Sequence, residues 1–388
     1  MKISDVFLVL LFPVSILQCL INYHTNESEP IFEVIYTPTN SSFKHVLQEY
    51  IRNRRFLTPA TPKPLAIIAA KHESHVQPTV VCFKFHSLQI RIRSGGHDYE
   101  SLSYVSDVPF VILDMFNLRS IDIDIANETA WVQAAATFGE LYYGIGKASK
   151  VHAFLAGVCP TVSVGGHFSG GGYGNMMRKY RLFVDNIIDA RLVDVNANTL
   201  DRSSMEEDLF WAIRGGGAAS FGVILSWKIN LVQVPETELT ELVFSRSRSD
   251  YVKRVIPKED FKKIWKMLYH TSWTEEGTED SRHYITLSRK LYEAIAPYMS
   301  QNPSEAFLNY RDLDIGSNPS NQTKFEEAKV YGSKYFRSSF LRLVDVKKRV
   351  VLIISSRMNK VFPHLKKSNR MTIYVTLRVF DVWTATYL

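Results

Sequence analysis

The sequence has few cysteines and lacks the short motifs of several large enzyme classes. Three cysteines occur among 388 residues, and they lack the spacing of zinc ligands, so we expect no metal site. No stretch reads G-x-S-x-G, which argues against a hydrolase elbow. None reads G-x-G-x-x-G, because Ser220 stands where the last glycine of such a run would be, so a Rossmann site is not supported.

A basic stripe of the kind that binds nucleic acid is also missing. The formal net charge is +7, but much of the excess lies in the last fifth of the chain, between Lys347 and Arg370. Upstream, basic residues do not alternate with aromatic ones, so we expect no nucleic-acid partner. Hydrophobic residues make up 46% and charged residues 22%, which is typical of a globular chain, and the length favours two domains.

Long apolar runs are absent except for a short one near the N-terminus. Lys2 followed by "VFLVLLFPVSILQCL" is typical of a secretory signal peptide, which we expect over residues 1–20, although the small-residue pattern does not place the cleavage site. A membrane anchor is the alternative, but the run is short for a span. Sequons for N-glycosylation add modest weight to secretion and start at Asn26, Asn40, Asn127 and Asn321.

Glycine, by contrast, is concentrated in three loops, "RIRSGGHDYESLSY", "GVCPTVSVGGHFSGGGYG" and "IRGGGAASFGVI". Each alone would be an ordinary turn. Glycines let backbone N–H groups approach a ligand closely, and two of these loops also carry a nucleophilic side chain. In an oxidising compartment an odd cysteine count leaves one thiol unpaired, and Cys159 in the second loop is the one that needs an explanation. Together the loops favour a large cofactor that bears phosphate.

The hydrophobic pattern mixes helices and strands up to residue 236 and becomes mostly helical afterwards. Strands are expected at 65–70, 88–96, 109–115, 129–136, 184–201 (two strands around a turn) and 221–236. Helices are expected at 71–87, 137–149 and 203–217. The second region predicts helices at 257–270, 279–299 and 324–350, with a strand and turn at 306–316.

These loops resemble the berberine bridge enzyme-like family of plant flavoprotein oxidases, which includes the reticuline oxidase-like proteins and the cannabinoid synthases. The resemblance continues through "EDLFWAIRGGG" and "FGVILSWKINLVQVPE" and returns in "AFLNYRDLDIG" and "GSKYFRSSFLRLVDVKKRV". It implies an α+β fold with a two-subdomain FAD-binding domain of the vanillyl-alcohol-oxidase (PCMH) type over 60–236. A shortened substrate and berberine-bridge-type C-terminal region would follow over 237–350, and a divergent tail over 351–388.

The resemblance also implies that FAD is attached to the protein twice. His97 in "SGGHD" would bond to the 8α-methyl carbon of the flavin ring, and Cys159 in "GVCP" to C6 of the same ring. Cys19 and Cys82 would remain as a disulfide. Two tethers would fix the ring and raise its reduction potential. The other residues expected around FAD are Arg93, Ser94, Gly95, Gly96, Asp98, Pro160, Val162, Gly165, Gly166, Gly171, Gly172, Tyr173, Gly174, Gly222 and Val223.

Three further side chains have roles that only the resemblance implies. Tyr310 in "LNYRDLD" would act as the catalytic base, although a half-buried structural tyrosine is the alternative. His167 would face the N1/C2 carbonyl edge of the flavin and stabilise the charge of the reduced ring, unless it is bonded within its own loop. Val162 matches a position that gates oxygen, and ordinary packing is its alternative.

The second half departs from the family pattern. Segments that would roof the flavin are missing on both sides of "IPKEDFKKIWKMLYH", and the sequence after Val350 resembles no family element. Arg181, Phe183 and Ala218 are smaller departures, and an arginine where the family has a small residue predicts a strained backbone at Arg181.

We therefore expect a secreted, monomeric FAD-dependent oxidase, located in the cell wall, the apoplast or the vacuole, with no membrane association after the leader is removed. A small alkaloid, phenolic, lignin alcohol or sugar would give a hydride to FAD, and dioxygen would reoxidise the flavin to yield hydrogen peroxide. The alternative is a flavin-binding remnant or secreted glycoprotein with weak or no catalysis. Whether purified protein is yellow, and whether substrate turnover yields peroxide, would separate the two.

Overall fold

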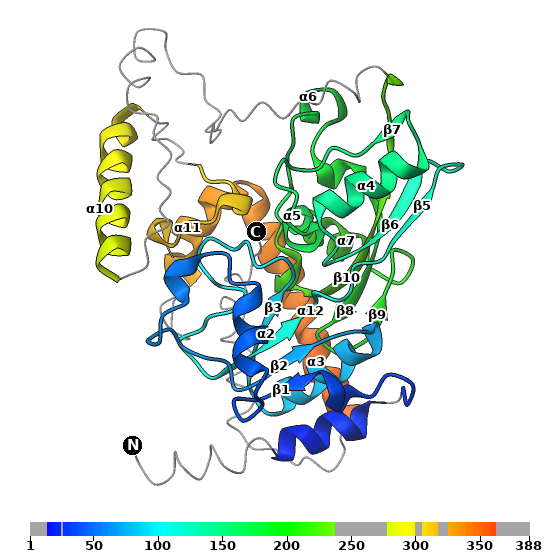
Figure 1. Ribbon diagram of the computed structural model, residues 1–388, viewed down its shortest axis with the longest axis vertical. Helices are drawn as coiled ribbons and strands as arrows, with labels where there is room; N and C mark the ends of the chain where they lie inside the picture. The colour runs from blue at the N-terminus through cyan, green and yellow to red at the C-terminus, as the bar shows by residue number, and fades with distance from the viewer. Residues whose placement is uncertain (1–13, 25, 237–277, 299–304, 317–324, 362–388) are drawn as a thin grey trace.

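The structure, a computed structural model, describes residues 14–24, 26–236, 278–298, 305–316 and 325–361 (Figure 1). The helix expected at 257–270 and the sequon at Asn321 lie outside these residues. Within the described part, no helix is long and apolar enough to cross a membrane.

A first sheet has the strand order β1-β2-β4-β3. Its central strand, β4, pairs in parallel with β2 and β3, and all of its residues are buried, which explains its continuous apolar run. β1, which precedes residue 60, pairs with β2 at the edge of this sheet. The elements are β1 (Ile35–Tyr36), α2 (Phe43–Glu49), β2 (Ile67–Ala69), α3 (Val76–Phe85), β3 (Gln89–Arg93) and β4 (Phe110–Asp114).

A second sheet has the order β5-β6-β10-β8-β9, with every pair antiparallel. Its strands are β5 (Ile121–Asp124), β6 (Thr129–Gln133), β8 (Ile187–Asp194), β9 (Thr199–Leu200) and β10 (Gly222–Asn230). Its helices are α4 (Phe138–Ala148), α5 (Val164–Ser169), α6 (Met177–Tyr180) and α7 (Glu207–Ile213), and β7 (His152–Ala153) pairs with β11 (Val232–Gln233). α4 begins at a capping box, in which Thr137 and Glu140 satisfy each other's backbone N–H groups.

The two sheets share a core, which confirms the predicted two-subdomain architecture. Val193, Val223 and Leu225 of the second sheet are buried in one cluster with Val111 and Leu113 of the first. In Figure 1 the first sheet with α2 and α3 lies below the second sheet with α4 and α7. Short 3₁₀ helices connect these elements and are η1 (Ile31–Val34), η2 (Arg54–Phe56), η3 (Glu73–His75), η4 (Phe183–Asn186) and η5 (Ala218–Ser220).

The N-terminal segment is tied to the first sheet by the expected disulfide, Cys19–Cys82, whose Cα atoms are 5.8 Å apart. Residues 14–23 form a helix, and Ile16 and Leu20 are buried against α3 in the same apolar cluster as Cys82. A leader that ends at residue 20 would remove Cys19, so this leader and the disulfide exclude each other. Any leader compatible with the disulfide ends before Cys19.

The C-terminal part joins the second sheet through its last helix. The described elements are α10 (Thr278–Ile295), η7 (Ala296–Tyr298), η8 (Leu308–Tyr310), η9 (Leu313–Ile315), α11 (Phe325–Phe336) and α12 (Ser339–Val361). Leu343 and Val346 of α12 enter the main apolar cluster, and Arg342 bonds to Asp208 of α7. The single helix expected at 324–350 is divided at Arg337, whose φ is +49°.

The strand expected at 306–316 is wrong. The chain forms two 3₁₀ turns there, in which the Tyr310 N–H donates to the Phe307 carbonyl at 3.0 Å and the Gly316 N–H to the Leu313 carbonyl at 3.1 Å. Asn309 is fully buried, and its side chain bonds to backbone groups of another loop. Hydrogen bonds within the turns and from the Asn309 side chain take the place of the backbone pairing of a strand. A short apolar pattern cannot distinguish a strand from such a turn.

Arg181 has the strained backbone that the sequence predicts, with φ +71° and ψ −162°. This region is essentially restricted to glycine. Arg181→Gly should therefore raise the free energy of unfolding by about 1 kcal/mol, since relief of strain outweighs the entropy that glycine adds to the unfolded chain. Denaturant unfolding measures this, with Arg178→Gly in α6 as a matched control that should be destabilised. Equal changes in the free energy of unfolding for Arg181→Gly and Arg178→Gly would contradict backbone strain at Arg181.

Candidate flavin site

His97 and Cys159, which are far apart in the sequence, both contact one hydroxyl group. The Nε2 atom of His97 lies 2.9 Å from Oγ1 of Thr161, and the sulfur of Cys159 lies 3.5 Å from the same oxygen. His97 follows β3, whereas Cys159 lies between β7 and α5. Cys159 is a free, exposed thiol. The fold therefore places the two predicted attachment residues side by side.

Two glycines allow this approach of the two loops. A Cβ at Gly95 would lie 2.8 Å from Oγ of Ser163 and 3.0 Å from its backbone nitrogen. Gly96 has φ +69°, and a Cβ there would lie 1.7 Å from the Tyr50 carbonyl oxygen. Any larger residue would push the His97 loop away from the Cys159 loop or from α2.

Burial shifts the pKa values of both His97 and Asp98, and in each case it favours the neutral form. Burial, reinforced by the charge of Arg52, lowers the pKa of His97 to about 4, so its ring has a free lone pair at neutral pH. Burial raises the pKa of Asp98 to about 6, against the hydrogen bonds that it accepts from the backbone N–H groups of Glu100 and Ser103. These two bonds fix the turn that follows His97.

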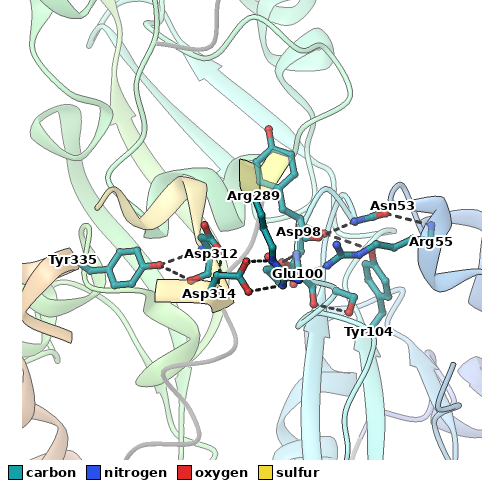
Figure 2. A network of polar contacts seen from close by, with 11 residues as sticks. Asn53, Arg55, Asp98, Glu100, Tyr104, Arg289, Asp312, Asp314 and Tyr335 are labelled. Atoms are coloured by element: carbon teal, nitrogen blue, oxygen red, sulfur yellow. Dashed lines mark hydrogen bonds and ion pairs between the residues drawn. The ribbon is translucent and has the colours of Figure 1, made fainter. Parts of the chain in front are cut away.

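A polar network holds the same turn between the N-terminal and C-terminal parts of the chain (Figure 2). Arg55 forms an ion pair with Glu100 at 2.7 Å, and the Asn53 amide donates to the Tyr99 carbonyl. On the C-terminal side, Arg289 pairs with Asp314, and the Tyr335 hydroxyl bonds to both backbone groups of Asp312. The charge of Arg311 also acts on Asp98, opposing the effect of burial. The loop of His97 and the segment of Tyr310 are thereby electrostatically connected.

His167 lies on α5 in a cluster of aromatic rings. Its ring centroid is 4.9 Å from those of Phe138 and Phe183, and its Nε2 lies 3.2 Å from the backbone nitrogen of Tyr173. Burial lowers its pKa to about 4, so it is neutral at physiological pH. Its ring anchors the turn of the second glycine loop. Any role toward a flavin would be that of a neutral hydrogen-bonding group, not of a standing cation.

Tyr310 lies beside the second glycine loop, where its hydroxyl contacts that of Tyr173. Its ring stacks on Tyr99, with centroids 5.8 Å apart and an interplanar angle of 18°. Asn309 positions it, because its amide accepts from the Gly172 N–H at 2.9 Å and donates to the His167 carbonyl at 3.0 Å. Sequence reasoning missed Asn309, Tyr99 and Thr161, whose only signal was their proximity to predicted residues.

A small cavity lies at the seam of the two sheets. Its lining includes several predicted cofactor residues and is made by Ile92, Ser94, Met115, Ala134, Gly165, Ser169, Ala219, Gly222 and Ile224. Added Cβ atoms at Gly165 and Gly222 would lie 2.6 Å from the Ala134 carbonyl and 2.4 Å from the Val193 carbonyl. These glycines let the strands and loops close around the seam.

The other predicted residues surround this seam in different ways. The fully buried Arg93 side chain bonds to Asp114 and to the carbonyls of Val46 and Leu47, so only its backbone remains for a cofactor. Gly171 and Gly172 have positive φ, and a Cβ at Gly174 would lie 2.4 Å from the Ala156 carbonyl. The Pro160 and Val162 carbonyls accept hydrogen bonds from the start of α4, and Gly166 and Val223 are buried.

These features fit a flavin. Two adjacent nucleophiles, one a neutral imidazole and the other a free thiol, lie on two glycine-rich loops that pack against each other, and further glycines line the small cavity between the two sheets. The fold and site define an FAD-binding domain of an oxidoreductase. Matches to known families agree, since the FAD binding domain family matches residues 64–202 and the berberine and berberine-like family matches residues 306–350.

The chain belongs to the berberine bridge enzyme-like family of FAD-linked oxidoreductases. It is 41% identical to berberine bridge enzyme-like 17 of Arabidopsis thaliana, covering 85% of this chain and 90% of the relative. The solved structure of BBE-like #28 from Arabidopsis thaliana has a TM-score of 0.76 at 32% identity, covering 87% of this chain and 96% of that one. Phl p 4, a grass pollen allergen with glucose dehydrogenase activity, has a TM-score of 0.76 at 29% identity, covering 86% and 96%.

The alignment with berberine bridge enzyme-like 17 runs over 481 positions, although this chain has only 388 residues. Stretches of the relative therefore have no counterpart here. The match to the berberine-like family ends at residue 350, where the family resemblance of the sequence also stops.

Proposed function

We propose that this protein is a secreted oxidase that holds FAD by two covalent bonds, through His97 and Cys159. The observation that carries this proposal is the convergence of the two side chains on Thr161, within 2.9 Å and 3.5 Å of its hydroxyl. A neutral imidazole nitrogen and a free thiol are the nucleophiles that such bonds require. The disulfide and the N-terminal apolar run support a secretory route.

Tyr310 is the residue that takes the proton of the substrate. Its hydroxyl contacts that of Tyr173. The Tyr173 hydroxyl can donate a hydrogen bond to the Tyr310 oxygen and so stabilise the phenolate, the form in which Tyr310 accepts a proton. Asn309 fixes the distance from Tyr310 to the second glycine loop. When bound, FAD supplies the hydride acceptor and passes the electrons to dioxygen. The protein residues bind the ring, orient the substrate and move the proton.

The substrate is a small organic molecule with an oxidisable C–H bond. Tyr99, Tyr173, Phe307 and Tyr310 form a group of aromatic rings whose neighbouring centroids are 5.8 to 6.2 Å apart, a wall on which a flat phenolic or alkaloid ring can stack. The glucose dehydrogenase activity of Phl p 4 supports a sugar as the other candidate, since sugars also stack on aromatic rings.

Peroxide formation tests the oxidase assignment. The purified yellow protein is reduced anaerobically by a substrate or by dithionite, excess reductant is removed, and air-saturated buffer is added. We expect rapid return of the yellow colour with one hydrogen peroxide released for each flavin. Reoxidation by a quinone or dye but not by dioxygen would mean a dehydrogenase instead.

Tyr310→Phe should slow anaerobic reduction of the flavin by substrate about a hundredfold, because it removes the proton acceptor but keeps the ring. The flavin content should not change, and dithionite should still reduce the variant at the wild-type rate. Tyr99→Phe is a matched control, since it retains the stacked ring beside Tyr310. A Tyr310→Phe variant as fast as the Tyr99→Phe variant would exclude Tyr310 as the base.

A flavin-binding protein with weak catalysis is the second candidate function. The observation that favours it is the length of the alignment with berberine bridge enzyme-like 17. The alignment runs over 481 positions, so this chain of 388 residues lacks stretches that the relative has. Rates of reduction by substrates separate it from the oxidase.

A further inference from the structure

The hydroxyl of Thr161 links the two attachment residues. It lies within hydrogen-bonding distance of one ring nitrogen of His97 and of the Cys159 sulfur. A hydroxyl has one proton to donate and lone pairs to accept, so when it donates a hydrogen bond to one of these two atoms it can only accept one from the other. Among the described residues, no other hydroxyl contacts both side chains.

The position of this hydroxyl is determined by the backbone. The carbonyls on either side of Thr161, those of Pro160 and Val162, accept hydrogen bonds from Gly139 and Phe138 at 2.9 Å each, which ties the loop to the first turn of α4. A Cβ at Gly95 would lie only 3.2 Å from the Thr161 carbonyl, so the His97 loop packs directly on this segment. Thr161 is therefore held between the two nucleophiles.

We propose that Thr161 is a positioning residue for both covalent attachments, accepting a hydrogen bond from the Nε2–H of His97 and donating one to the sulfur of Cys159. This inference rests on the proposed double attachment of FAD. In the His97 tautomer that it selects, the proton is on Nε2 and the lone pair of Nδ1 is free to attack. The thiolate is the nucleophilic form of cysteine, and in this arrangement the hydroxyl donates its hydrogen bond to the sulfur that attacks. The opposite sense would place the proton on Nδ1 and leave the thiol protonated.

The Thr161 hydroxyl also lies beside the two protein atoms that lose a proton when the bonds to flavin form. In each attachment a bond forms from Nδ1 or Sγ to a flavin carbon, and one C–H bond of the flavin breaks. The protein loses one proton, from Nε2 of His97 or from the thiol. The two electrons of the broken C–H bond would stay on the flavin until dioxygen takes them, and the proton of that bond together with the proton from the protein completes hydrogen peroxide. Thr161 is in contact with both protein groups that lose a proton.

Three variants test the role of the hydroxyl. Thr161→Val removes the oxygen but keeps the shape, and Thr161→Ser keeps the oxygen. Thr199→Val, on the exposed edge strand β9, controls for a threonine-to-valine change elsewhere. Apoprotein is mixed with FAD in air, samples are denatured in acid over time, and peptide mass spectrometry quantifies flavin on the His97 and Cys159 peptides. Repeating the experiment in Cys159→Ala and His97→Ala backgrounds follows each bond separately.

We expect Thr161→Val to slow formation of each bond about tenfold, the equivalent of one lost hydrogen bond at each reacting atom, whereas Thr161→Ser and Thr199→Val attach flavin at the wild-type rate. Wild-type rates in Thr161→Val, or an equal loss in Thr161→Ser, would overturn the role of Thr161 while leaving double attachment intact. Absence of covalent flavin in the wild-type protein would instead overturn the proposed double attachment, and this inference with it. Thermal unfolding of the apoproteins checks that each variant is folded, and Thr161→Ser remains informative if Thr161→Val is not.

Discussion

Replacing both His97 and Cys159 with alanine is expected to leave the protein without covalently held flavin, whereas either single change should leave one bond. The two side chains lie on separate loops and both contact the Thr161 hydroxyl, so the loss of one leaves the other in place for the proposed attachment. The proposed attachment through His97 should not depend on pH across the neutral range, because the pKa of His97 lies near 4 and its ring is neutral there.

Acid precipitation measures this directly. The yellow colour should pellet with the wild-type protein and with both single variants, and should remain in the supernatant of the double variant. Mass spectrometry of the pelleted peptides then assigns each remaining bond. Colour that pellets with the double variant would place an attachment on another residue, and colour released from the wild-type protein would exclude covalent attachment.

The two glycine-rich loops of the candidate site could be recognised in the sequence because glycine, histidine and cysteine are directly visible in it. Gly95 and Gly96 are needed for contacts that no larger residue allows, and their presence beside His97 is a local signal. The strain at Arg181 was predictable for the same reason, since a single side chain determines which backbone angles are favourable.

The contacts between distant segments could not be predicted from local patterns. Asn309 reads as part of an apolar strand, yet it is buried with its amide on the backbone of the second glycine loop, 137 residues earlier in the chain. Arg93 is among the residues expected around FAD, but its guanidinium bonds to Asp114 and to the Leu47 carbonyl of α2. Such bonds depend on which loops the fold brings together, and composition or periodicity does not contain that information.

We expect this chain to bind FAD well but to be slow in the step in which substrate reduces the flavin. We expect bulky phenolic or alkaloid substrates to reduce the bound flavin slowly or not at all, about a hundredfold below an enzyme that holds the reacting C–H bond in place. The two proposed attachment residues lie side by side, but Tyr99 is 51% and Tyr310 36% exposed, and this chain lacks stretches that berberine bridge enzyme-like 17 possesses. An open site admits water and leaves the substrate poorly oriented.

Stopped-flow reduction of the yellow protein by a panel of phenolic, alkaloid and sugar substrates measures these rates, and berberine bridge enzyme-like 17 in the same assay provides the matched comparison. Sulfite and dithionite are small enough to reach the flavin without a shaped site, so they should react with both proteins at similar rates. That control separates a slow substrate from an inaccessible or damaged flavin. Reduction of this chain by any substrate at about ten per second, the rate of an ordinary enzyme, would mean that this chain suffices for catalysis and that the stretches found only in the relative are not needed to enclose the site.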